Sequence, residues 1–127
     1  MSDEKKYQIK IGACAYYLNE KSDTKTSRYV FAYGIRVHNI GSVSAPLVSR
    51  HWIITDSEGH VQEVRGLGVI GKQPILKPDE SFEYTSWCQL ATPVGTMRGT
   101  YLMVADDGAQ FEAPIAEFLL SMPRMLH

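Results

Sequence analysis

Three glycines spaced as G-x-G-x-x-G are the residues of this chain whose type and spacing most directly suggest chemistry. They are Gly66, Gly68 and Gly71, with Arg65 before them and Lys72 after them. Glycine permits positive φ and close backbone approach, so successive N–H groups in such a loop can form a nest that holds phosphate oxygens. These five residues therefore form a candidate phosphate-binding site.

A second interpretation of the glycines is structural. In a dinucleotide-binding fold this spacing opens a helix whose N-terminus receives the pyrophosphate, but the prolines at 74 and 78 do not permit a continuous helix here. The glycines would then shape a β-bulge or a crossover between two sheets, with Leu67, Val69 and Ile70 packed inward. We favour this interpretation, because no helix dipole assists phosphate binding.

The histidines could provide metal or catalytic chemistry only if the fold assembled them. Their spacing contains no H-x-x-x-H, and a site made of His51, Asp56 and His60 would need residues from both arms of a hairpin. Ser49, His51 and Asp56 share one segment, but their sequence positions assign them no catalytic roles. We predict no metal site, no resident cofactor and no enzymatic activity.

Composition limits the class of partner. The chain has 127 residues and a formal net charge of −1, which gives no long-range field for nucleic acid or an anionic membrane. No apolar run is long enough for a secretory signal or a membrane span. We therefore predict one cytoplasmic domain over residues 1–127, with residues 1–6 flexible, that meets proteins or small molecules. The two cysteines, Cys14 and Cys88, are predicted to be reduced and mostly buried.

Apolar residues alternate with polar ones along most of the chain. This period of two predicts half-buried strands, with Val48, Trp52 and Ile54 sharing one face of the third. The predicted strands cover residues 9–17, 29–37, 47–56, 61–65, 82–86, 97–105 and 110–118. Residues 116–120 have some helical propensity but lie between prolines, which leaves little more than a turn. The pattern predicts an all-β, antiparallel β-sandwich with no substantial helix.

Several long motifs give the chain a resemblance to the ApaG domain proteins of bacteria. The motifs are Tyr29-Val30-Phe31-Ala32-Tyr33, residues 49–56, residues 63–66 with 73–74, Phe82-Glu83-Tyr84-Thr85-Ser86, residues 92–97 and residues 118–127. The resemblance implies a fibronectin type III-like or immunoglobulin-like sandwich that serves protein contact. It also implies a link to cobalt tolerance and magnesium flux, and it brings a nucleotide or pyrophosphate ligand into consideration.

The chain departs from that family pattern at Leu67, Asp79 and Trp87, where the family usually has glutamate, glycine and glycine. Loss of the acidic residue at position 67 weakens any metal role of the loop, whereas an exposed Trp87 would enlarge a contact surface. The apolar C-terminal tail must also pack, either on its own sandwich or on a second subunit in a homodimer. Predicted partner contacts are Trp87, Met122, Met125 and Leu126.

Two functions follow from these observations. The first is a non-enzymatic interaction module that recruits a protein partner through loops and sheet edges. The second is a small-molecule sensor that binds a nucleotide or pyrophosphate at Gly66–Gly71 and is coupled to divalent cation homeostasis.

Overall fold

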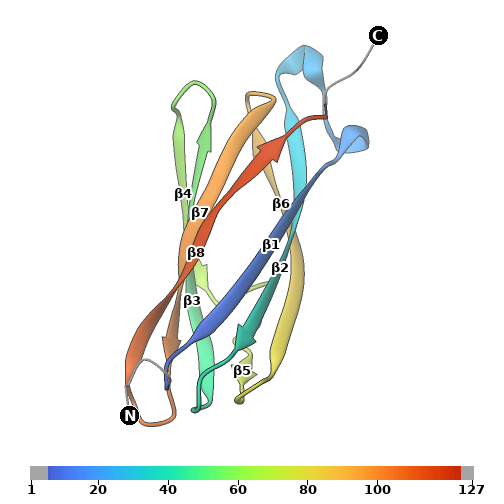
Figure 1. The fold of residues 1–127 in the computed structure, drawn as a ribbon. Coiled ribbons are helices and arrows are strands. Elements are labelled where there is room, and N and C mark those ends of the chain that lie inside the picture. Colours follow the sequence, from blue (N-terminus) through green and yellow to red (C-terminus); the bar gives the residue numbers. More distant parts are fainter. Residues whose placement is uncertain (1–5, 124–127) are drawn as a thin grey trace.

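The computed structural model describes residues 6–123 and shows two antiparallel β-sheets packed face to face (Figure 1). The strands in these residues are β1 (Ile9–Tyr17), β2 (Tyr29–Asn39), β3 (Ala45–Asp56), β4 (Val61–Leu67), β5 (Ile75–Leu76), β6 (Ser81–Leu90), β7 (Val94–Val104) and β8 (Gln110–Ser121). Two three-residue 3-10 turns, η2 (Asn19–Lys21) and η3 (Thr24–Thr26), connect β1 to β2. The predicted all-β sandwich is confirmed.

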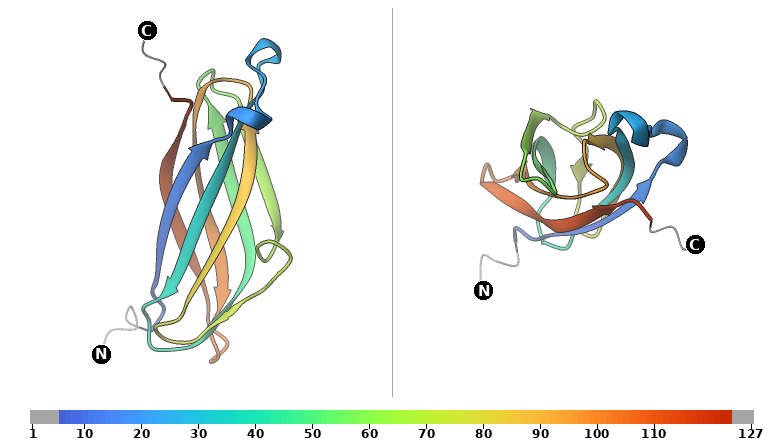
Figure 2. Two further views of the ribbon diagram at one scale, coloured as in Figure 1. Left: turned by 90° about the vertical axis from the view of Figure 1, so that its right-hand side faces the viewer. Right: turned by 90° about the horizontal axis from the view of Figure 1, so that it is seen from above.

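The two sheets are closed on one side and open on the other. One sheet has the order β1-β2-β6, and the other has the order β4-β3-β7-β8 with β5 paired to the start of β3. β8 lies against β1, as the view from above in Figure 2 shows, whereas β4 and β6 are the outer strands of the opposite side. The glycine motif begins at Gly66 near the end of β4 and therefore lies on this open side.

The core is built from the alternation that the sequence displays. Phe31, Tyr33, Ile35 and Val37 of β2 are all buried, as predicted. Trp52 of β3 meets Tyr33 across the sandwich in an edge-on contact, with ring centroids 5.5 Å apart. Such aromatic pairs add about 0.5–1.5 kcal/mol to the free energy of unfolding beyond the area that they bury.

A β-bulge changes which residues of β3 face the core. The register of β3 against β7 shifts between Leu47 and Ser49. Before the bulge Leu47 is fully buried, and Val48, predicted to share the face of Trp52, is only half-buried. After the bulge the inward positions have even numbers. Arg50 therefore projects from the same face of the strand as Trp52.

The C-terminal strand is longer than predicted. Residues 116–120, expected to form little more than a turn, continue β8 to Ser121, and Leu120 is fully buried. The backbone N–H of Met122 then donates to the carbonyl of Pro93 at 2.8 Å. The described part of the tail thus packs on its own sandwich, whereas Met125 and Leu126 lie outside the described residues. Residues 1–5, part of the N-terminus predicted to be flexible, also lie outside the described residues.

The cysteines occupy different environments. Both are free thiols, and Cys88 is buried as predicted. Cys14 is exposed, so the prediction that it is mostly buried was wrong. The reason is that Cys14 lies beside Gly34 on the outer face of its sheet, where no strand or turn of residues 6–123 packs over it. No helix in the described part of the chain is long and apolar enough to cross a membrane.

Candidate functional site

The glycine motif forms a tight hairpin turn. Val69 and Lys72 exchange two backbone hydrogen bonds of 2.8 and 2.9 Å. Between them Ile70 and Gly71 have φ values of 44° and 76°, so both central residues are left-handed, as in a type I′ turn. Gly71 adopts this conformation freely, whereas a β-branched residue such as Ile70 is strained there by about 1–2 kcal/mol.

The backbone donors of the motif are largely occupied by the hairpin itself. The N–H of Gly68 donates to the carbonyl of Val48 at 2.7 Å, and the N–H groups of Val69 and Lys72 form the paired bonds of the turn. A phosphate nest built on these three donors would have to break the bonds that shape the loop. Phosphate binding at the loop stays a prediction.

The apolar side chains of the motif do not all pack inward. Val69 is fully buried, but Leu67 and Ile70 are 74% and 52% exposed. The expectation that all three fill the core was therefore wrong for two of them. Because the chain reverses at Ile70 and Gly71, only one apolar residue of the hairpin can reach the sandwich interior.

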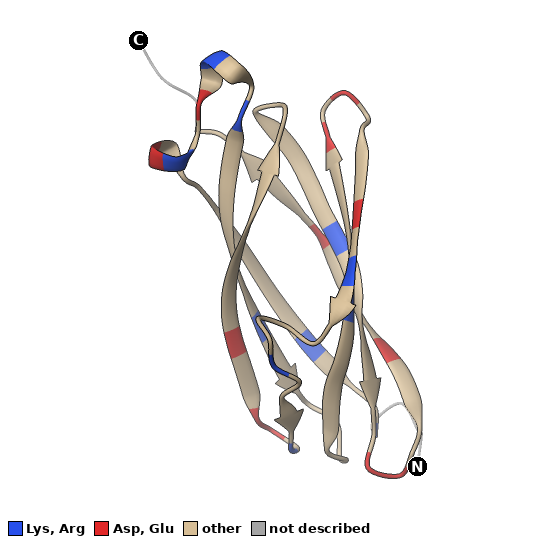
Figure 3. Cartoon of the chain, turned by 180° about the vertical axis from the view of Figure 1, so that it is seen from behind, with Lys and Arg blue, Asp and Glu red and all other residues tan. Residues whose placement is uncertain are grey.

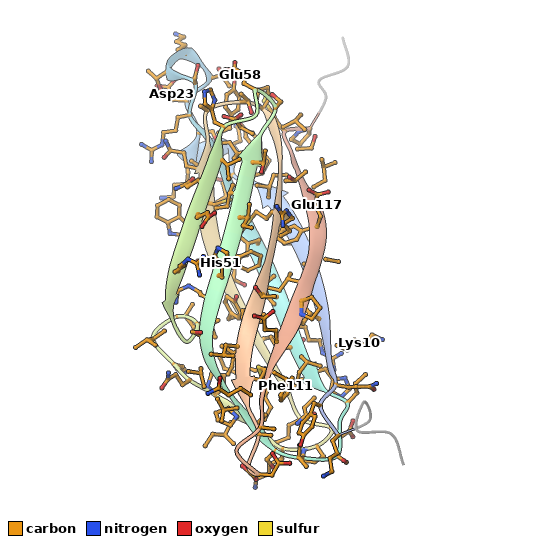
Figure 4. The ribbon with its side chains drawn as sticks, turned by 90° about the vertical axis from the view of Figure 1, so that its left-hand side faces the viewer. Lys10, Asp23, His51, Glu58, Phe111 and Glu117 are labelled. Carbon is orange, nitrogen blue, oxygen red and sulfur yellow. The ribbon has the colours of Figure 1, made fainter. Side chains whose placement is uncertain are left out.

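The two cations predicted to flank a phosphate differ in their surroundings. Arg65 faces outward, where its Nη2 lies 3.7 Å from an oxygen of Glu63, and His51 contacts the same carboxylate at 3.2 Å. Figure 4 shows His51 on the outer surface of the β3–β4 pair. Lys72 is exposed beside the turn. Glu63 thus offsets the charge of Arg65, and Lys72 remains the cation at the tip.

The residue that holds the loop is Arg50, which was not among the predicted site residues. Its Nη1 donates to the carbonyl oxygens of Leu67 at 3.1 Å and Gly68 at 2.9 Å. Its guanidinium covers Gly66, where a Cβ would lie 2.8 Å from Nη1. The loop therefore turns carbonyl oxygens, not N–H groups, toward this cation. An arginine two residues before Trp52, at an inward position of the alternation, was the available signal in the sequence.

Buried tyrosines lie near Arg50 in the core. The hydroxyls of Tyr84 and Tyr101 are hydrogen-bonded to each other. Burial raises the pKa of Tyr84 to about 12, although its bond to Tyr101 and the charge of Arg50 act in the opposite direction. Burial also raises the pKa of Tyr101, and the neighbouring Tyr84 adds to that effect. Both hydroxyls are therefore neutral at physiological pH and serve the core.

The fold brings together two of the residues weighed for a metal or catalytic site, Asp56 and His60, but places His51 apart from them. Asp56 ends β3 and pairs with His60 at 3.2 Å across the β3–β4 turn. Burial alone would raise the pKa of Asp56, but hydrogen bonds from the backbone N–H groups of His60 and Glu58 hold it below its usual value. His51 is five residues from Asp56 along the strand, or about 17 Å. Within residues 6–123, no three His, Cys, Asp or Glu side chains gather as metal ligands would.

Of the predicted partner contacts, Trp87 is the most prominent in the structure. It stands on the outer face of β6 with 63% of its surface exposed. The pairing of the strands places Tyr16, Ala32 and Trp87 in one row across the sheet, with both aromatic side chains exposed. Met122 is half-buried beside the end of β8.

Comparisons with known proteins agree with this architecture. A family model described as the ApaG domain matches residues 19–105. The chain is 58% identical to the protein ApaG of Thiobacillus denitrificans and 59% identical to that of Dechloromonas aromatica, each over 127 residues and the full length of both chains. A crystal structure of an ApaA protein from Bordetella pertussis superposes with a TM-score of 0.92 at 58% identity, covering 95% of this chain and 98% of that one.

Proposed function

The chain belongs to the ApaG domain family, and we propose that it works in the cytoplasm as a non-enzymatic protein-interaction module. The observation that carries this proposal is the row of Tyr16, Ala32 and Trp87 on the outer face of the three-stranded sheet. A solvent-facing sheet surface is ordinarily polar, and an apolar patch on it is typical of an interaction site.

The surroundings of Trp87 suit a protein partner. On one side the sheet forms a shallow trough whose floor includes Gly12 and Gly34. On the other side the indole borders a hollow with Lys21 and Arg28. Tryptophan, tyrosine and arginine are the residue types enriched at interaction hot spots, and Trp87, Tyr16 and Arg28 supply all three. The role of such an interaction in cobalt tolerance and magnesium flux is the one that family resemblance implies.

Affinity purification from the native cell tests the proposal. Wild-type protein and a Trp87→Ser variant would be compared by quantitative mass spectrometry, with Val61→Ser as the control. Val61 is 60% exposed on β4, so its substitution removes a similar degree of apolar exposure elsewhere. We expect a defined partner to be lost with Trp87→Ser and retained with Val61→Ser. Equal recovery of every protein by all three baits would contradict the proposal.

A second function is a small-molecule sensor that binds a nucleotide or pyrophosphate at Gly66–Gly71. Exposed Lys72 and the left-handed turn beside it support this alternative. Calorimetric titration with ATP, GTP and pyrophosphate separates it from the first. Heat that saturates in wild type and is lost in Lys72→Gln would favour the sensor, and no heat at millimolar ligand would exclude it.

A further inference from the structure

The open side of the sandwich contains a cleft between β4 and β6. Its volume is about 280 Å³, and Figure 3 looks onto the side where it lies. Its walls combine apolar side chains, among them Trp52, Val64 and Trp87, with polar groups from Ser86 and Arg50. Small-molecule sites typically have this mixture of apolar surface and a few placed polar groups.

Arg50 is the one charged residue in the lining of this cleft. Within residues 6–123 no carboxylate lies within ion-pair distance of it, and both of its hydrogen bonds come from Nη1. The Nε and Nη2 groups, which form the edge that binds a carboxylate bidentately, make no bond to described residues. A half-buried guanidinium in this state has unused donors and an uncompensated charge.

A second unused donor lies next to it on the same strand face. Trp52 is 98% buried, being 2% exposed, and its Nε1 has no partner within the described residues. A Cβ built on Gly99 of β7 would lie 3.2 Å from Cε3 of this indole, so the Cε3 edge of the ring faces β7. Trp52 also lines the cleft, and its Nε1, on the ring edge opposite Cε3, is buried without a hydrogen-bond partner among the described residues. Residues 50 and 52 are about 7 Å apart along the strand, so one ligand can lie beside both.

From these contacts we infer that the cleft between β4 and β6 is a binding site for an organic carboxylate with an apolar body, anchored by Arg50. The carboxylate takes the free Nε and Nη2 edge, and the apolar body lies along Trp52, Val64 and Trp87. The cleft shares Trp87 with the proposed partner surface, but its anchor, Arg50, lies on β3 and takes no part in the row of Tyr16, Ala32 and Trp87.

The charge of the cleft distinguishes a carboxylate from a phosphate. One arginine balances one negative charge, whereas a phosphate monoester carries between −1.5 and −2 near neutral pH. The remaining charge would lie against apolar walls, where an unpaired charge is costly. The chemistry therefore fits a monoanionic acid better than a nucleotide.

Titration of phenylacetate into uniformly ¹⁵N-labelled protein, followed by NMR, tests the inference. The chain has two tryptophans, so Trp87→Phe identifies the indole N–H signal of Trp52. We expect this signal to move and saturate with phenylacetate, and not with the neutral phenylacetamide or with phenyl phosphate. Titration of acetyl-Gly-Gly-Phe in parallel distinguishes the two possible sources of the carboxylate, a protein C-terminus and a free acid. Tighter binding of the peptide assigns the carboxylate to a protein C-terminus, and tighter binding of phenylacetate assigns it to a free acid.

Two variants make the test decisive. Arg50→Gln should weaken binding about 10- to 100-fold, because hydrogen bonds to a charged group contribute about 1.5–3 kcal/mol. Arg98→Gln, on the exposed face of β7, should leave it unchanged. Ser86→Leu keeps Arg50 but fills the cleft, so it should abolish binding even if Arg50→Gln fails to fold. No shift at 20 mM phenylacetate, an equal shift with the amide, or wild-type affinity in Ser86→Leu would overturn the inference.

Discussion

The guanidinium of Arg50 lies where a side chain of residue 66 would have to be. A Cβ built on Gly66 would meet Nη1 at 2.8 Å and both Cζ and Nη2 at 2.9 Å. The same guanidinium donates to two carbonyls of the loop that follows. The first glycine of the motif is therefore required by close approach of an arginine.

Replacement of Gly66 by alanine should destabilise the protein by about 1–2 kcal/mol. The added methyl displaces the guanidinium from its two carbonyl acceptors, each a charge-assisted hydrogen bond, although the flexible arginine can partly adjust. Denaturant unfolding followed by fluorescence measures the difference in free energy of unfolding.

Gly12→Ala serves as the control for this substitution. A Cβ at Gly12 meets nothing within 4 Å, so alanine there should change the free energy of unfolding by less than about 1 kcal/mol. The cost at Gly66 should also fall when Arg50 is already glutamine, because the two residues are in contact. An equal cost of Gly66→Ala in both backgrounds would show that the arginine is not its cause.

The hairpin glycines should differ from each other in their tolerance of alanine. Gly68 has φ +60° and its Cβ would lie 2.1 Å from the carbonyl oxygen of Lys72, whereas Gly71 has φ +76° and open space. Gly71→Ala should cost about 1 kcal/mol from backbone strain, and Gly68→Ala should cost at least twice as much because the turn must also move. Thermal unfolding of the two variants would reveal the order, and a larger cost at Gly71 would contradict it.

Ile70 should respond in the opposite direction. Its φ of 44° is unfavourable for a β-branched residue, and its side chain is half exposed. Ile70→Asn should therefore stabilise the protein by about 0.5–1 kcal/mol, since asparagine tolerates the left-handed region. Val69→Asn is the matched comparison, because it buries a polar group in the core and should be strongly destabilising. A lower melting temperature for Ile70→Asn would mean that its contacts outweigh its strain.

Most of the fold could be predicted from the sequence because strand alternation is a local signal. Phe31 to Val37 alternate without interruption, and the hairpin after Asp56 has a glycine with φ +85° where the turn needs it. The bulge at Leu47 was not predictable from this signal, because one inserted residue reverses the face of everything after it. The role of Arg50 likewise depends on its pairing with Gly66 across two strands, a contact that composition and spacing do not encode.

Buried tyrosines should make the protein sensitive to alkaline pH. Tyr84 keeps its proton in the folded state to a pKa of about 12, whereas the ordinary value is 10.0. The folded state thus binds more protons between these values. Its stabilising contribution is complete below pH 10 and is lost as pH rises toward 12. The loss from Tyr84 should reach about 2–3 kcal/mol. Denaturant unfolding between pH 8 and 12 measures it.

Single phenylalanine variants identify the groups responsible for this loss. Tyr84→Phe and Tyr101→Phe should each flatten the decline above pH 10, because burial raises the pKa of both tyrosines above the ordinary value of 10.0. Tyr29→Phe is the control at a partly buried position beside the core. An identical pH profile for all three variants and wild type would contradict the assignment.

The two thiols should react at very different rates in the native protein. Cys14 is exposed on the outer sheet face, whereas Cys88 is buried beside Met97, and burial raises its pKa to about 11 from 9.0. At pH 8 the thiolate fraction of Cys88 is about 100-fold lower than in the unfolded chain. Iodoacetamide should therefore modify Cys88 at least about 100-fold more slowly in the native protein than in the unfolded chain. Peptide mapping by mass spectrometry would follow both sites, with Cys14→Ser leaving only the slow thiol. Equal rates, or a native Cys14–Cys88 disulfide, would mean that the two residues do not occupy opposite faces of the sheet.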